Sequence, residues 1–223
     1  MGSISGKIIN HDTSFFGEIY FNNEIEKITK DIKVGDNIII PGYVDLHCHG
    51  GNGSDTMDGS ESIKKMASYH LNKGTTTLLA TTWTNTLEYT YKALTGFNNL
   101  INNDSNLIGV HLEGPFINPN KLGAQPPLTQ KPSIAFIEKI MAIANIKVIT
   151  LAPEIEDMEN FIPYLIDNKI KVQFGHSLAD YFCCKKYMKK FNIGFTHLYN
   201  AMSGNDHRAP GVLSAALLEG EYA

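Results

Sequence analysis

From Pro41 onward, short apolar runs alternate with helical patterns, and this alternation limits the possible folds more than any other feature of the sequence. Strand-length apolar runs separated by helical stretches predict successive βα units built around a parallel sheet. We expect strands at 38–40 together with 44–46, then at 75–80, 107–112, 147–152, 170–174 and 193–196, with helices near 60–72, 87–101, 133–144, 157–168 and 179–190.

The first forty residues show a different pattern, in which short strand-like runs are separated by turn residues such as Asn22 and Asn23. Short apolar runs bounded by turn residues are typical of short β-strands. We therefore predict a small N-terminal β domain at residues 1–40, forming part of a β-sandwich, and a second domain at residues 41–223. The strand patterns of the first domain cover 7–10, 17–21, 24–30 and 36–40.

Two α/β architectures fit the second domain: an open doubly wound sheet and a (β/α)8 barrel. Polar residues decide between them, because ligand-type side chains directly follow the apolar runs of several predicted strands. Barrel enzymes collect their catalytic groups at this C-terminal face of the sheet. We therefore predict a TIM barrel of the metal-dependent hydrolase type, incomplete, with about six of the eight βα units. The residues concerned are His47, His49, Glu113, His176 and His197.

Composition excludes several other classes of protein. The net charge of −4 leaves no basic excess for nucleic-acid binding. No apolar stretch reaches the length of a membrane span, and the N-terminus lacks the apolar core of a signal peptide. The odd number of cysteines, three, favours reduced thiols. We expect a cytoplasmic protein with neither a nucleic-acid nor a membrane partner.

The strand-end residues have the chemistry of metal ligands. His47 and His49 are two apart, so on a strand both imidazoles point to the same side and can bind one ion. Glu113, His176 and His197 follow three different strands, and one carboxylate with two imidazoles leaves open positions for catalysis. We expect one divalent ion, with a second as an alternative; these ligands suit Zn, Fe, Mn and Co alike.

Four blocks of the sequence resemble the N-acetylglucosamine-6-phosphate deacetylases of the amidohydrolase superfamily. The resemblance runs from about residue 38 to the end, and the initial strands are similar to the small β domain of such enzymes. The block THLYNAM followed by an arginine is highly specific, HLEGP is moderately so, and the HxH pair is common to the superfamily. The blocks are PGYVDLHCHGGNGSDTMDG, HLEGPFINPNKLGAQPP, FGHS and THLYNAMSGNDHRAPG.

The resemblance implies roles for particular residues. Glu113, His176 and His197 would bind the main metal ion, and His47 and His49 match a pair that some members use for a second one. Four further positions match contacts to the sugar phosphate. Among them is the only arginine of the chain, whose planar fork suits a phosphate dianion. These positions are Ala124, Asn200, Ala201 and Arg208.

The resemblance also implies an activity, the hydrolysis of N-acetyl-D-glucosamine 6-phosphate to D-glucosamine 6-phosphate and acetate. Family members use an aspartate as general acid and base, and we expect it to lie beyond Ala223, together with the last barrel strands. We identify no catalytic aspartate here, and a homodimer is one expected state.

Two alternatives stay open. The first is an inactive fragment that retains metal or sugar-phosphate binding. The second is another amidohydrolase, such as a dihydroorotase-like enzyme, against which the lack of a carboxylatable lysine at a strand end and the presence of HLYNAM both argue.

Overall fold

A computed structural model describes residues 1–30, 35–101 and 105–220, and the chain divides into two compact units, Met1–Tyr43 and Val44–Ala223. The first unit is one sheet of four strands in the order β3-β2-β1-β4. β1 pairs antiparallel with β2 and parallel with β4. The described strands of this unit form one layer, and the sandwich stays a prediction. The strands are β1 (Gly2–Ile9), β2 (Ser14–Phe21), β3 (Ile25–Lys30) and β4 (Asn37–Ile39).

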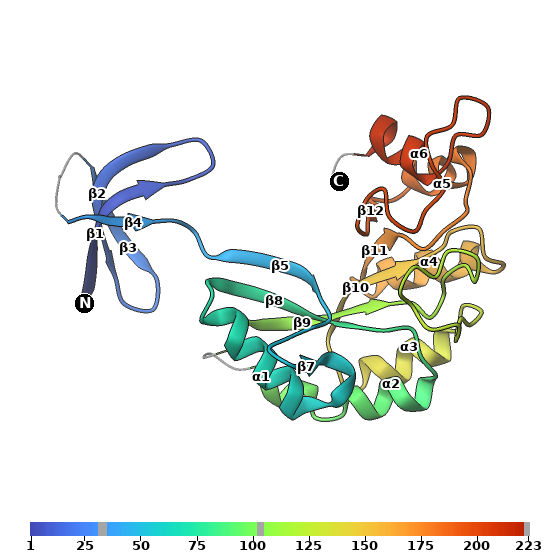
Figure 1. Cartoon of the computed structure of the whole chain (residues 1–223), viewed down its shortest axis with the longest axis horizontal. Helices are drawn as coiled ribbons and strands as arrows, with labels where there is room; N and C mark the ends of the chain where they lie inside the picture. Colours follow the sequence, from blue (N-terminus) through green and yellow to red (C-terminus); the bar gives the residue numbers. More distant parts are fainter. Residues whose placement is uncertain (31–34, 102–104, 221–223) are drawn as a thin grey trace. The chain divides into compact units, whose positions relative to one another are not determined.

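The second unit contains a six-stranded sheet in the order β12-β11-β10-β9-β8-β5 (Figure 1). The strands from β8 to β12 pair in parallel. Neighbours in the sheet follow each other in the chain, whereas a doubly wound sheet reverses its order at a switch point. The prediction of an incomplete (β/α)8 barrel is therefore confirmed. The strands are β5 (Tyr43–Cys48), β8 (Thr75–Thr82), β9 (Leu107–Glu113), β10 (Ile146–Leu151), β11 (Lys171–Phe174) and β12 (Gly194–Phe195).

The prediction that residues 38–40 and 44–46 belong together is wrong. Residues 38–40 and 44–46 were expected to act together, but the structure assigns them to different sheets. β4 ends at Ile39 and pairs with β1, whereas β5 begins at Tyr43 beside β8. Pro41, which has no N–H to donate, and Gly42 separate the two strands.

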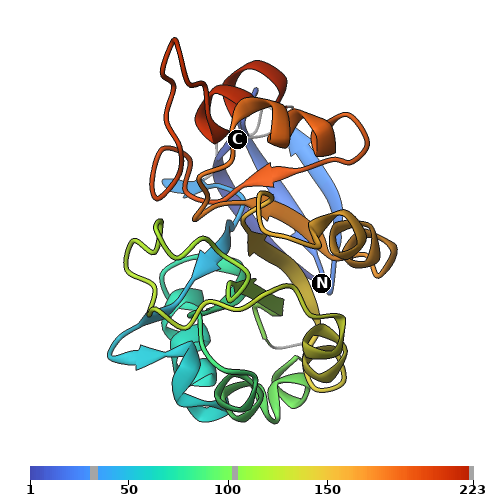
Figure 2. The same ribbon diagram turned by 90° about the vertical axis from the view of Figure 1, so that its right-hand side faces the viewer.

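Helices follow the strands and lie along one side of the curved sheet (Figure 2). The predicted helix at 87–101 is too long: α2 stops at Leu94, Gly96 takes φ 83°, and a 3-10 turn (η2) covers Phe97–Leu100. Glycine adopts this left-handed conformation without steric cost, which ends the helix. The helices are α1 (Ser60–Leu71), α2 (Leu87–Leu94), α3 (Ile134–Met141), α4 (Met158–Asp167), α5 (Tyr181–Met188) and α6 (Val212–Glu219).

The core lies between the sheet and these helices. One apolar face of α4 is buried, and the helix continues through Pro163. Phe161, Ile162 and Leu165 are at most 2% exposed. Within residues 1–30, 35–101 and 105–220, no helix is both long and apolar enough to cross a bilayer.

Two features of the second unit favour self-association. Within the described ranges, β5 and β12 each have a strand partner on one side only. Helix α6 also exposes Leu217 and Leu218, which are 52% and 74% accessible. Open strand edges and apolar surface both promote contacts between copies. We therefore expect the 223-residue chain to self-associate as its concentration rises.

The double change Leu217→Lys and Leu218→Lys should shift this association to higher concentration, because it places two charges on the apolar surface. Sedimentation velocity over a concentration series measures the effect. Tyr91→Lys, at an exposed position of α2, is the matched control and should leave the association unchanged. A wild-type chain that stays monomeric throughout the series would contradict the prediction.

Candidate metal centre

Five ligand-type side chains come together at the carboxyl ends of the barrel strands. Glu113 is the last residue of β9, and His47 lies in β5 with His49 directly after it. His176 and His197 follow the last residues of β11 and β12 by two positions. Because the strands are parallel, their carboxyl ends share one edge of the sheet. The pairing order therefore brings together residues that lie far apart in the sequence.

The Glu113 carboxylate is the centre of the group, and its side chain is 1% exposed. Its Oε1 atom lies 3.0 Å from Nε2 of His176 and 3.0 Å from Nε2 of His197. Its Oε2 atom lies 2.9 Å from Nε2 of His49, and Nε2 of His47 is 3.6 Å from Oε1. Glu113 thus belongs to two triads of possible metal ligands, one with His176 and His197 and one with His47 and His49.

The hydrogen bonds behind the imidazoles indicate where their protons are. Nδ1 of His176 lies 2.9 Å from the Lys121 carbonyl, and Nδ1 of His49 lies 3.2 Å from the Thr81 carbonyl. A carbonyl oxygen only accepts, so Nδ1 donates in both rings. In the neutral rings Nε2 then carries a lone pair, and in both it faces the Glu113 carboxylate. A cation between these atoms removes the repulsion, so the donor set fits a divalent metal ion.

The electrostatics keep the central ligand ionised. Burial would raise the pKa of the Glu113 carboxyl, but polar contacts with His176, His197 and His49 hold it well below its ordinary value. Burial lowers the pKa of His47. At neutral pH, Glu113 is a carboxylate and His47 is a neutral imidazole, which are the forms that bind metals.

A buried glutamine that we did not identify from the sequence orients the carboxylate. Nε2 of Gln125 donates to Oε2 of Glu113 over 2.5 Å, and its Oε1 accepts from the Thr84 backbone N–H over 2.6 Å. Gly114, which directly follows Glu113, has φ 73°. A Cβ at this position would lie 2.1 Å from Oγ1 of Thr84, so there is no room for a side chain. Gln125 directly follows Ala124, one of the expected substrate contacts, and this adjacency was the available signal.

A second unpredicted contact fixes His49. The Trp83 ring stacks on the His49 ring with centroids 3.7 Å apart and planes 13° from parallel. The Trp83 indole N–H donates to Asp55 over 3.0 Å. His49 is therefore held both by this ring and by the Thr81 carbonyl.

Beneath the metal-ligand group, a chain of polar side chains crosses the barrel interior. His111 Nδ1 lies 2.8 Å from the Leu46 carbonyl, so it donates and Nε2 accepts. Nε2 lies 2.6 Å from the Thr150 hydroxyl, which is 2.7 Å from the Thr196 hydroxyl. Thr196 Oγ1 lies 2.7 Å from Oε1 of the Gln173 amide. Burial lowers the pKa of His111 to about 3, so this ring is neutral.

The direction of this chain follows from counting protons. The three contacts are His111–Thr150, Thr150–Thr196 and Thr196–Gln173, and each needs one donated proton. If the Gln173 oxygen faces Thr196, only the two hydroxyl groups can donate, and one contact is left without a proton. Turning the amide over gives each contact one donor, running from Gln173 through Thr196 and Thr150 to His111. All hydrogen bonds in this row of side chains therefore point the same way. The last one runs from His111 to the Leu46 carbonyl on β5, the strand that also carries His47.

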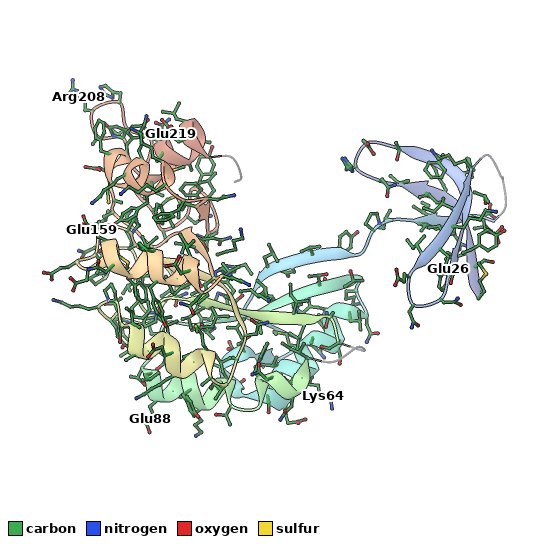
Figure 3. The ribbon with its side chains drawn as sticks, turned by 180° about the vertical axis from the view of Figure 1, so that it is seen from behind. Glu26, Lys64, Glu88, Glu159, Arg208 and Glu219 are labelled. Atoms are coloured by element: carbon green, nitrogen blue, oxygen red, sulfur yellow. The ribbon has the colours of Figure 1, made fainter. Side chains whose placement is uncertain are left out.

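The residues expected to bind sugar phosphate fall into two groups. A Cβ on Gly123, beside Ala124, would lie 3.5 Å from both Ala201 and His176, so two of the expected segments meet next to the metal-ligand group. Asn200 is exposed, and its backbone N–H donates to the His197 carbonyl over 2.9 Å. Arg208 instead lies at the outer tip of the loop before α6, pointing away from the sheet (Figure 3). The structure does not bring Arg208 to the metal-ligand group.

The chain is similar in sequence to a known family and to several enzymes. A family described as "Amidohydrolase family" matches residues 38–210. The chain is 38% identical over 205 residues to the N-acetylglucosamine-6-phosphate deacetylase of Bacillus subtilis, covering 86% of this chain and 51% of that one. It is 32% identical to the N-acetylgalactosamine-6-phosphate deacetylase of Escherichia coli O157:H7, covering 87% and 54%. The chain thus spans about half the length of these curated relatives.

A solved structure is similar as well. The N-acetylglucosamine-6-phosphate deacetylase of Thermotoga maritima aligns with a TM-score of 0.88 and 31% identity. The alignment covers 99% of this chain and 62% of that one.

The polar chain yields a stability prediction. Thr150→Val removes the hydroxyl between His111 and Thr196 and leaves buried polar atoms without a partner, which costs about 1–3 kcal/mol of unfolding free energy. Thr150→Ser keeps the hydroxyl and should cost less. Urea unfolding of the three proteins measures the difference. Equal stability of the valine and serine variants would show that these hydrogen-bonded side chains contribute nothing to the free energy of unfolding.

Proposed function

The chain belongs to the amidohydrolase family, and we propose that it binds a divalent metal ion and an N-acetylated hexosamine 6-phosphate for hydrolysis of the acetamide bond. One observation carries the proposal: Glu113, His176 and His197, from three different strands, place their ligand atoms 3.0 Å apart. Metal–ligand bonds of about 2.0–2.2 Å are compatible with this spacing. Three protein ligands with an open position are typical of catalytic rather than structural sites.

The ion would be held by Glu113, His176 and His197, with His47 and His49 as ligands of a second ion. When bound, such an ion supplies Lewis acidity, which polarises the substrate carbonyl and makes water more acidic. The chain's own residues orient this centre. Gln125 fixes the carboxylate, and the Lys121 and Thr81 carbonyls fix the rings of His176 and His49. The ligand set admits Zn, Fe, Mn or Co.

For the substrate we propose N-acetyl-D-glucosamine 6-phosphate, with D-glucosamine 6-phosphate and acetate as products. The 38% identical relative from Bacillus subtilis, which is named for this substrate, supports the choice. The segments of Ala124 and Ala201 beside His176 are where we place the sugar. The relative from Escherichia coli is named for the galactosamine epimer, which makes N-acetylgalactosamine 6-phosphate the second candidate.

Proton transfer is the step for which we assign no residue. Within the described ranges, the two ligand triads around Glu113 contain no aspartate. General acid–base catalysis contributes roughly 10²–10⁴-fold to rate. We therefore propose that the 223-residue chain binds metal and substrate but releases acetate slowly, at a rate reduced by about that factor.

Metal loading and acetate release test this proposal together. The metal-free chain is loaded with each ion in turn, and acetate release is measured with N-acetylglucosamine 6-phosphate and its galactosamine epimer, with the Bacillus subtilis enzyme as benchmark. Ring opening of dihydroorotate, which releases no acetate, is followed separately by the loss of its ultraviolet absorbance. His176→Ala removes a ligand and should lower the metal content by the ion that the Glu113 group holds. His207→Ala, whose side chain is 81% exposed, is the control and should bind metal normally.

Metal content unchanged in His176→Ala would sink the ligand assignment. Slow acetate release together with tight sugar-phosphate binding is the expected result. Metal binding without affinity for either sugar phosphate would refute the substrate, and turnover of dihydroorotate would favour the other amidohydrolase class. Benchmark-level turnover would show that an unassigned group of this chain transfers the proton.

We further propose that Arg208 binds the phosphate, with its loop folding toward the sugar. In this structure the Asp206 carboxylate accepts the Arg208 backbone N–H over 2.7 Å and leaves the guanidinium exposed. Arg208→Lys should weaken binding of N-acetylglucosamine 6-phosphate by about tenfold or more, because an ammonium cannot form the bidentate contact. Calorimetric titration with the phosphorylated and the plain sugar measures this. Equal losses for both sugars would mean that Arg208 acts through folding.

A further inference from the structure

A second group of ligand-type atoms lies beside β5, distinct from the Glu113 group. Cys48 sits between His47 and His49, and because side chains alternate along a strand it points to the opposite face. The Cys48 side chain is buried, with the residue 7% exposed. Its Sγ atom lies 3.3 Å from Nε2 of His70, which comes from α1. The Gly50 carbonyl oxygen accepts from this sulfur over 3.2 Å and from this nitrogen over 3.1 Å. Binding of a cation would therefore release the thiol proton to solvent and leave the imidazole proton on Nδ1.

Two further donors border these three atoms. The Asp45 carboxylate belongs to the same group, with its ligand atom and those of Cys48 and His70 all within 4.8 Å of one another. The Met66 thioether sulfur lies 4.0 Å from the Cys48 sulfur. Gly51 leaves room for His70 in this position, because a Cβ there would lie 2.6 Å from Nε2 of His70 and the ring would have to shift. The backbone is thus shaped to admit the imidazole.

These atoms have the chemistry of a thiophilic metal site. Sulfur, imidazole nitrogen, carboxylate and carbonyl oxygen together select ions such as Zn²⁺ over Mg²⁺ or Ca²⁺. Zn–S bonds are about 2.3 Å and Zn–N bonds about 2.0–2.1 Å, so donors 3.1–3.3 Å apart can share one ion after only a small outward shift. The Glu113 group contains no sulfur, so the two sites differ in the metal ions that they prefer.

We propose that Cys48, His70 and the Gly50 carbonyl, with Asp45, bind a Zn²⁺-like ion at a site separate from the Glu113 group. The two sites are neighbours along one strand, because His47 and His49 flank Cys48. An ion on Cys48 would therefore restrain the segment that carries the histidine pair. Ligation through sulfur also leaves a spectroscopic signature that the other group cannot produce.

Cobalt titration tests the proposal on the full chain. The protein is made metal-free in a reductant without thiols and titrated with Co²⁺. A sulfur ligand gives an intense near-ultraviolet charge-transfer band, whereas nitrogen and oxygen ligands give only weak visible bands. We expect the intense band in the wild type and its disappearance when Zn²⁺ is added. The band should persist in His176→Ala, which disables the Glu113 group.

Matched variants assign the ligands. Cys48→Ser should lose the band, while the double variant Cys183→Ser and Cys184→Ser, which removes the other two thiols, should keep it. His70→Asn retains the thiol and should weaken Co²⁺ affinity at this band at least tenfold. Circular dichroism checks that each variant is folded, and His70→Asn decides the matter if Cys48→Ser is not. Absence of the band in the wild type, its persistence in Cys48→Ser, its loss in His176→Ala or an unchanged affinity in His70→Asn would each overturn the proposal.

Discussion

The burial of one carboxylate determines how this end of the barrel is built. Glu113 is 1% exposed, and an isolated charge at such a position is strongly destabilising. The amide of Gln125 donates to it, and a cation shared with the imidazoles around it would supply the remaining compensation. Each of these groups comes from a different segment, so the charge makes the segments depend on one another. Removing any one of them leaves the others facing an anion with fewer partners.

Other polar contacts hold the loops that carry these groups. Glu154 accepts hydrogen bonds from the Asn118 amide and the Leu178 N–H through Oε1 and from the Ser177 hydroxyl through Oε2. The Asn118 N–H in turn donates to the His176 carbonyl over 2.9 Å. His176 has φ 50°, a conformation that is unfavourable for a residue with a Cβ. Contacts on both sides thus maintain a strained backbone at a ligand position.

Periodic features of the sequence were enough to predict the sheet and the common edge at which the ligand-type side chains lie. Parallel strands share their carboxyl edge, so a polar residue just after an apolar run has a predictable place, as Glu113 and His176 illustrate. Contacts made by loops have no such rule. Gln125 reaches Glu113 from a loop with no regular structure, and Arg208 lies on another such loop. The break at Pro41 was misjudged because a proline and a glycine between two apolar runs fit one bent strand as well as two.

The order of the strands also has a consequence for how the metal centre forms. Glu113 and His197 are 84 residues apart in sequence, and Glu113 and His176 are 63 apart. Contacts over such distances close large loops and form late in folding. The centre therefore exists only once β9 to β12 have assembled, and an ion that binds it acts as a reversible cross-link across the sheet. At 100 times its dissociation constant, such an ion adds about 2.7 kcal/mol to the free energy of unfolding by mass action alone. Metal supply would then set the fraction of the chain that is folded.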